Sequence, residues 1–167
     1  KKRHKKIYAL INVAGIASMN LAIAMPEDIT RKIINTNLLG TIFLNQLFST
    51  LLIRNNNGRI INFSTVAVNL AIKGESVYTA SKAGIESYSR TLAKELSSFN
   101  ITVNCIAPGP IKTDLTAGVT DKQLEKIINQ QIIQKQLHPS DVMDQVDLLL
   151  SEKAKYITGE VIVVGGV

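Results

Sequence analysis

The sequence predicts an α/β fold, an open parallel sheet of about four strands with helices on both faces. Short apolar runs rich in β-branched residues alternate along the chain with longer stretches of helical periodicity. Polar residues and glycines follow these runs directly, at the place where the carboxyl ends of parallel strands bind ligands. The 167 residues, 46% of them apolar, suffice for one domain with a sizeable core.

Four apolar runs are expected to be the strands. Each is apolar at successive positions, which is typical of strands covered by helices on both faces. Each is also bounded by charged, asparagine, glycine or proline residues that end a strand. The expected strands are residues 7–13, 59–63, 101–106 and 160–164.

The stretches between these runs have the spacing of helices. Pro26 and the two acids after it suit the first turn of a long helix, and Asn35, Asn37 and Gly40 predict either a kink inside it or a split into two helices. No uninterrupted apolar run reaches the length of a membrane span, so no membrane partner is expected. The expected helices are 25–54, 76–97, 121–135 and 141–151, with a loop over 69–75.

Charge and cysteine content restrict the functional classes. The net charge is +6, but the basic tail over residues 1–6 carries five positive charges and leaves the rest nearly neutral. Such a tail is more often solvated than bound to nucleic acid, so no nucleic-acid partner is expected. The single cysteine, Cys105, allows no internal disulfide, which fits a cytoplasmic location. No Cys/His/Asp cluster has the spacing of a metal site.

The stretch from Gly58 to Gly84 is the best candidate for chemistry. A buried strand ends there in two hydroxyls, Ser64 and Thr65, and Tyr78 and Lys82 follow four residues apart. On a helix that spacing places the phenol and the ammonium on one face. A hydroxyl, a phenol and an ammonium could polarise a carbonyl and transfer a proton, and the ammonium is expected to lower the pKa of the phenol. Taken alone, such a Tyr–Lys pair is more often an ordinary surface pair.

Five motifs in order resemble the short-chain dehydrogenase/reductase family, most closely its 3-oxoacyl-carrier-protein-reductase-like subgroup. Two motifs depart from the family pattern: Val13 replaces the second asparagine of NNAG, and Val164 stands where an acid is common in the closing segment. The five are NVAG at 12–15, Asn37 in NTNLLG, YTASKAG at 78–84, NCIAPGP at 104–110 followed by Thr113, and the closing segment 156–166.

This resemblance implies a doubly wound, Rossmann-type domain over residues 7–167 and an NAD(P)-dependent oxidoreductase. Such an enzyme interconverts a small-molecule carbonyl and a secondary alcohol, with NADP slightly favoured over NAD, and is expected to form a homo-oligomer, a dimer or a tetramer. The implied catalytic residues are Tyr78 as general acid/base, Lys82 at the nicotinamide ribose, Asn37 holding a water, and Thr65 or Ser64 as the substrate-binding hydroxyl. The implied cofactor-binding residues are Asn12, Ala14, Gly15, Tyr78, Lys82, Pro108, Gly109, Ile111 and Thr113.

The family's glycine-rich cofactor turn has no counterpart in this sequence. We therefore expect the chain to correspond to the C-terminal part of the family domain, without roughly its first three strands. The strand at 7–13 would then lie at a sheet edge and invite pairing or aggregation. An alternative is a non-catalytic member or interaction module that binds no cofactor. A nucleotide-sugar epimerase or dehydratase also uses Tyr-x-x-x-Lys, but the Pro108-Gly109 loop disfavours it.

Overall fold

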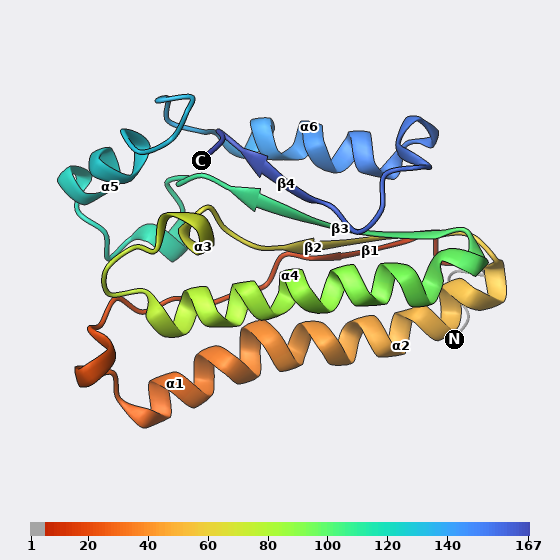
Figure 1. The fold of residues 1–167 in the computed structure, drawn as a ribbon, viewed down its shortest axis with the longest axis horizontal. Coiled ribbons are helices and arrows are strands. Elements are labelled where there is room, and N and C mark those ends of the chain that lie inside the picture. Colours follow the sequence, from red (N-terminus) through yellow and green to blue (C-terminus); the bar gives the residue numbers. More distant parts are fainter. Residues whose placement is uncertain (1–5) are drawn as a thin grey trace.

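A computed structural model describes residues 6–167, so the predicted basic tail lies outside the described residues except for Lys6. Four parallel strands form one sheet in the order β1-β2-β3-β4 (Figure 1). This arrangement confirms the predicted α/β fold with a parallel sheet. The strands are β1 (Ala9–Asn12), β2 (Gly58–Phe63), β3 (Ile101–Pro108) and β4 (Val161–Val164).

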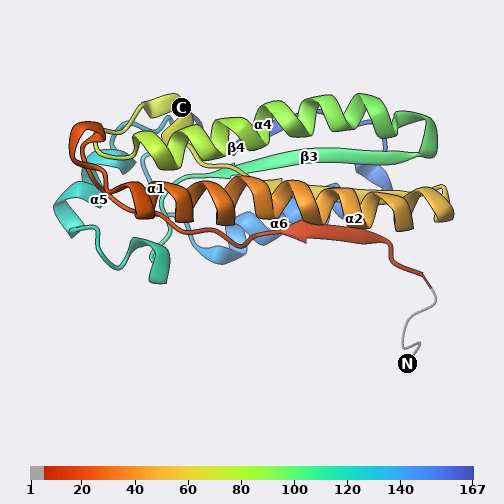
Figure 2. The same ribbon diagram turned by 90° about the horizontal axis from the view of Figure 1, so that it is seen from below.

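Helices cover the two faces of the sheet unequally. A long helical segment and α4 lie side by side on one face, and α6 lies on the other (Figures 1 and 2). The long segment consists of α1 (Glu27–Ile33), η2 (Ile34–Leu39) and α2 (Gly40–Asn55). The other main helices are α4 (Ser76–Leu96), α5 (Asp121–Ile128) and α6 (Pro139–Leu150). Short turns complete the fold at η1 (Ala22–Ala24), α3 (Ala67–Leu70), η3 (Ser97–Phe99), η4 (Asp114–Thr116) and η5 (Glu152–Ala154).

The three strand-to-strand connections do not share one hand. All three step across the sheet in the same direction, because each strand pairs with the next one in sequence. The first two pass through α2 and α4 on one face, whereas the third passes through α6 on the opposite face (Figure 1). The third connection therefore has the opposite hand from the first two, which departs from the usual uniform right-handed rule.

Two apolar cores lie on the two faces of the sheet, and adjacent residues of β2 divide between them. Ile60 packs with Leu52 of α2, Leu92 of α4 and Val103 of β3. Ile61 packs on the other side with residues of α6 that include Val146. Burial on both faces explains why the central strands β2 and β3 show no alternation of apolar and polar residues.

The segment Glu27–Asn55 is one continuous helical stretch, and by length and composition alone it could cross a membrane. Its middle, Ile34–Leu39, is a π-helical turn. The predicted kink is thus realised as a widened turn at Asn37. The inner side of α2 is mostly polar, with Thr41, Asn45 and Ser49 buried against the sheet and α4.

Two local predictions differ from the structure. Residues 67–70 form a helical turn close to the predicted loop, and α5 ends at Ile128 instead of residue 135. The reason for the early end is a competing interaction. The Ile132 and Ile133 amides donate to the carbonyls of Gly166 and Gly165, at 3.2 and 2.8 Å, so this part of the chain pairs with the C-terminal segment instead of continuing the helix.

Candidate active site

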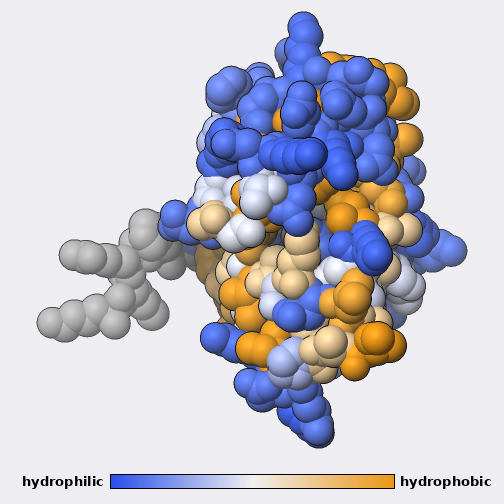
Figure 3. Space-filling model, turned by 90° about the vertical axis from the view of Figure 1, so that its left-hand side faces the viewer, coloured by the Kyte–Doolittle hydropathy of each residue, from blue (hydrophilic) through white to orange (hydrophobic). Residues whose placement is uncertain are grey.

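A cavity of about 630 Å³ lies at the carboxyl ends of the strands. Figure 3 views this end of the molecule, which is polar over α5 and the turn after it and carries apolar patches lower down, where η1 and α1 lie. One side of the cavity, here called the catalytic wall, consists of Ser64, Thr65, Tyr78 and Lys82. The opposite side belongs to residues 110–137, here called the covering segment, which contributes apolar side chains from η4 and α5.

Helix α4 presents Tyr78 and Lys82 to the cavity one turn apart, as the spacing predicts. Both side chains are buried, with 7% and 4% of their surfaces exposed, so they are not the surface pair that such a spacing usually indicates. The Lys82 ammonium donates to the Phe63 carbonyl at the end of β2, at 2.8 Å. Its nitrogen lies 5.9 Å from the centre of the Tyr78 ring.

The two candidate hydroxyls point to different partners. The Thr65 hydroxyl lies close enough to the Tyr78 phenol to lower the pKa of that phenol, and it accepts from the Ala67 amide at 3.2 Å. The Ser64 hydroxyl instead donates to the carboxylate of Glu86, on the same helix as Tyr78. The geometry therefore associates Thr65, and not Ser64, with the phenol.

Burial dominates the electrostatics of the catalytic wall. It raises the pKa of Tyr78 to about 12, despite the opposing effect of the Thr65 hydrogen bond, and Glu75 raises it further. Burial also lowers the pKa of Lys82 to about 8. The expectation that Lys82 lowers the pKa of the phenol is wrong for this structure, because the desolvation of the phenol outweighs the opposing effects. Tyr78 is consequently a protonated donor near neutral pH.

Asn37 joins the loop after β1 to α4. Its amide oxygen accepts from the Ile16 amide at 2.9 Å, and its nitrogen donates to the Ile16 carbonyl at 2.9 Å and to the Ser81 hydroxyl at 3.1 Å. Asn37 is completely buried. A side chain at Gly15 would lie 3.3 Å from the Lys82 nitrogen and 3.5 Å from the Asn37 oxygen, so glycine keeps the space in front of these groups open.

Seven of the nine predicted cofactor residues line the cavity, and two do not. Asn12 is buried and donates to Asn62 at 2.7 Å and to Asn45 at 3.3 Å, so its side chain belongs to the packing between the sheet and α2. Ala14 is exposed and does not line the cavity. The residues that do are Gly15, Tyr78, Lys82, Pro108, Gly109, Ile111 and Thr113.

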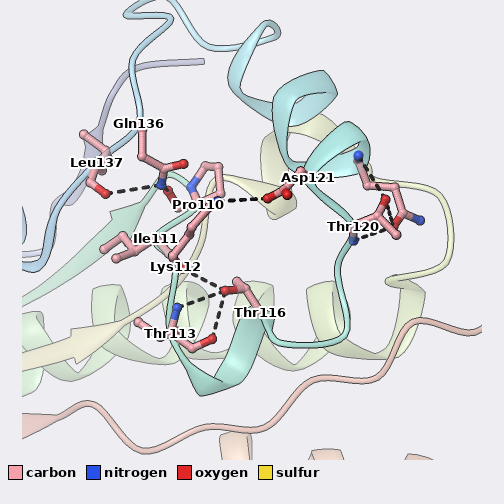
Figure 4. A network of polar contacts seen from close by, with 10 residues as sticks. Pro110, Ile111, Lys112, Thr113, Thr116, Thr120, Asp121, Gln136 and Leu137 are labelled. Carbon is pink, nitrogen blue, oxygen red and sulfur yellow. Dashed lines mark hydrogen bonds and ion pairs between the residues drawn. The ribbon is translucent and has the colours of Figure 1, made fainter.

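The covering segment is held by polar contacts near its surface (Figure 4). The Thr116 hydroxyl donates to the carbonyls of Ile111 and Thr113, each at 3.0 Å, and accepts from the Thr113 amide. Lys112 pairs with Asp121 at 2.8 Å, with both side chains exposed. The Gln136 amide donates to the Pro110 carbonyl at 3.0 Å, which ties the end of the segment to its beginning.

Several cavity residues were missed by the sequence reasoning. Glu75 lies three residues before Tyr78, and its helical spacing could have found it. The apolar residues carry no such signal, because their pattern equally suits a core. Gln131 was also missed; it lies behind Gly109, is 98% buried, and approaches so close that a side chain at Gly109 would collide with it. The missed apolar residues include Met19, Ile72, Leu115, Val119, Leu124 and Ile127.

Comparison with known proteins decides the family. The sequence model of a family described as Enoyl-(Acyl carrier protein) reductase matches residues 1–166. The chain is 38% identical over 157 residues to the 3-oxoacyl-[acyl-carrier-protein] reductase FabG of Staphylococcus aureus (strain N315), and 36% identical to the protein of that name from Staphylococcus epidermidis. The chain belongs to the short-chain dehydrogenase/reductase family.

The match covers nearly all of this short-chain dehydrogenase/reductase chain but less of its relatives. It spans 94% of the chain and 64% of the Staphylococcus proteins. A FabG protein from Rickettsia felis is 38% identical over 161 residues, 96% of the chain and 67% of that protein. The chain thus spans about two thirds of the length of these relatives. Within residues 6–167, no group of three or more His, Cys, Asp or Glu side chains could hold a metal ion.

Proposed function

We propose that the chain carries the catalytic residues of an NADPH-dependent reductase that interconverts a carbonyl and a secondary alcohol. The observation that carries this proposal is the convergence of Thr65, Tyr78 and Lys82 in one cavity at the strand ends. NADPH is preferred over NADH because the motifs resemble the 3-oxoacyl-carrier-protein-reductase subgroup. The similarity to FabG proteins makes a 3-oxo ester or thioester the first substrate class to test.

The cavity residues fit the nicotinamide end of such a cofactor. The buried Lys82 ammonium makes a single hydrogen bond within the described part of the chain, so it has donors left for ribose hydroxyls. Gly15 leaves space in front of this ammonium. Pro108, Gly109, Ile111 and Thr113 would surround the nicotinamide. When bound, the cofactor supplies a hydride to the carbonyl carbon.

The residues of the catalytic wall supply the proton and orient the carbonyl oxygen. The Tyr78 phenol donates its proton to the carbonyl oxygen, which its raised pKa favours near neutral pH because the phenol stays protonated. Thr65 donates a hydrogen bond to the same oxygen and holds it beside the phenol. Asn37 fixes the loop after β1 against α4 and thereby keeps Gly15 facing Lys82.

The test is NADPH oxidation with a 3-oxo ester by the purified protein and by Tyr78→Phe. Removing the phenolic hydroxyl should lower kcat by about 10²–10⁴-fold, the usual contribution of a general acid. NADPH binding, followed by fluorescence, should change little. A protein that neither binds NADPH nor reduces a ketone would support the non-catalytic alternative instead.

We further propose that the protein is a homo-oligomer that associates through the outer side of α2. Phe43 and Leu47 are each about three-fifths exposed there and are accompanied by Leu44. Thr41, Asn45 and Ser49 face inward, and Gln46 and Thr50 are exposed. An apolar outer face of this kind is typical of an interface. Light scattering after size exclusion tests it, and a clean monomer would refute it. A cytoplasmic location remains our expectation and fits the free, buried thiol of Cys105.

A further inference from the structure

Glu75 is a cavity residue that the fold itself does not use. It directly precedes α4 and lines the cavity with Tyr78, one turn further along the helix. Its carboxylate does not cap the helix, although it occupies the capping position. Within residues 6–167 it also forms no ion pair. The carboxylate is partly buried and opens onto the cavity, so a ligand in the cavity can pair with it.

The charges around the cavity are unbalanced. Two acids, Glu75 and Asp114, line it, and among the described lining residues Lys82 is the single cation. The Lys82 ammonium donates to the Phe63 carbonyl and lies next to Gly15, and it forms no ion pair with either acid. Burial raises the pKa of Glu75, and its charge contributes to the raised pKa of Tyr78, so the carboxylate is close enough to influence the reacting phenol.

Many of the remaining cavity residues are apolar. Met19, Ile72, Leu115 and Leu124 contribute hydrocarbon surface to the cavity. A purely apolar ketone that filled this space would remove water from the Glu75 carboxylate without replacing the lost hydrogen bonds. An anionic ketone would be repelled. A cation held beside the apolar surface would satisfy both features of the site.

We propose that Glu75 selects ketone substrates that carry a cationic group. The cation would lie against the Glu75 carboxylate while the carbonyl oxygen contacts Tyr78 and Thr65 one helical turn away. This inference rests on the proposed reductase function, but it concerns the substrate and not the reaction. In the reaction the ketone carbon gains the hydride and the oxygen gains the Tyr78 proton, and the cationic group stays unchanged.

Two 3-oxo esters of nearly equal shape provide the test. Acetoacetylcholine carries a quaternary ammonium, and 3,3-dimethylbutyl acetoacetate has a neutral carbon in its place. The protein should prefer the choline ester by about fivefold in kcat/KM, the upper value for a partly exposed charge pair. Glu75→Gln, which keeps the shape and removes the charge, should abolish that preference mainly through KM.

Glu95→Gln is the matched control. It removes the same charge from the same helix about 30 Å away, since 20 helical residues separate the two positions. Glu95 is exposed and does not line the cavity, so this variant should keep the preference for the choline ester. Equal preference in wild type and Glu75→Gln would overturn the inference.

Binding without cofactor separates this inference from the proposed function. Saturation-transfer NMR measures the binding of both esters to the protein without any turnover. If neither ester is reduced, the reductase proposal fails, and the binding preference still decides the role of Glu75. Stronger binding of the choline ester, lost in Glu75→Gln, supports that role, and equal binding of both esters refutes it.

Discussion

The two sides of the cavity are held in different ways. The catalytic wall rests on buried and partly buried contacts: Lys82 donates to the Phe63 carbonyl, and Asn37 is bonded to Ile16 and Ser81. The covering segment rests on contacts at or near the surface, such as those of Thr116 and the exposed pair of Lys112 and Asp121. Both sides follow strands of the same sheet. The covering segment has one buried polar anchor, Gln131, which packs against Gly109, and its other polar contacts lie closer to water.

Under the proposed function, the catalytic wall carries out the reaction and the covering segment contacts the substrate. Proton transfer requires fixed distances, and groups locked by buried hydrogen bonds provide them. Surface-held elements open locally at lower free energy and tolerate changes of sequence. We therefore expect substitutions in the catalytic wall to change the rate or the pH dependence strongly, and substitutions in the covering segment to have small effects.

The largest effect should come from removing the Thr65 hydroxyl, and removing the neighbouring Ser64 hydroxyl should have a much smaller one. Thr65→Val removes the hydroxyl that lines the cavity beside Tyr78 and should lower kcat by about 10²–10³-fold, as loss of an oxyanion donor does. Ser64→Ala should cost much less activity, because Ser64 bonds to Glu86 and not to the phenol. Steady-state kinetics with a 3-oxo ester measure both. A larger loss in Ser64→Ala would reverse the assignment.

An intermediate effect should come from the buried ammonium. Burial lowers the pKa of Lys82 from 10.5 in the unfolded chain to about 8 in the fold, so folding is penalised below pH 8 and the penalty disappears as the pH rises through 10.5. Lys82→Met carries no such penalty. The stability of the wild type relative to Lys82→Met should thus increase by about 2–3 kcal/mol between pH 7 and pH 10.

Urea unfolding of both proteins at the two pH values measures this change. Lys94→Met is the control, because Lys94 is an exposed lysine on the same helix. The stability of the wild type relative to this variant should not change with pH. If the difference in unfolding free energy between wild type and Lys82→Met stays constant with pH, the Lys82 ammonium is well solvated.

The smallest effect should come from the covering segment. Thr116→Val removes a hydroxyl that bonds to Ile111 and Thr113, and it should lower the free energy of unfolding by only about 1 kcal/mol because these contacts are near water. Thermal unfolding measures it. A loss as large as that from a buried polar contact would show that the covering segment is fixed as firmly as the catalytic wall.

Much of the fold was predictable because its signals are local. Apolar runs gave the four strands, and the spacing of Tyr78 and Lys82 placed both on one helical face. The early end of α5 was not predictable, because it depends on pairing with Gly165 and Gly166, more than thirty residues away. The opposite hand of the last connection likewise depends on which face α6 covers.

The site was predictable in its residues and less so in its energetics. Motif order brought Thr65, Tyr78 and Lys82 together, and the structure places all three at the cavity. The raised pKa of Tyr78 was not foreseen, because the sequence does not reveal how completely a phenol is buried. Asn12 was assigned to cofactor contact, but in the structure its side chain turns inward to Asn45 and Asn62.

These inward asparagines have a consequence for how the chain finds its native pairing. β1 pairs with β2 so that Asn12 lies opposite Asn62, and Asn62 also accepts from Asn45 and donates to Ser89 at 2.8 Å. Strands that are apolar on both faces have little in their hydrophobic pattern to oppose a shift by one residue. Such a shift would leave several side-chain amides buried among hydrocarbon side chains without hydrogen-bond partners. The buried asparagines thus favour one register for the pairing of β1 with β2.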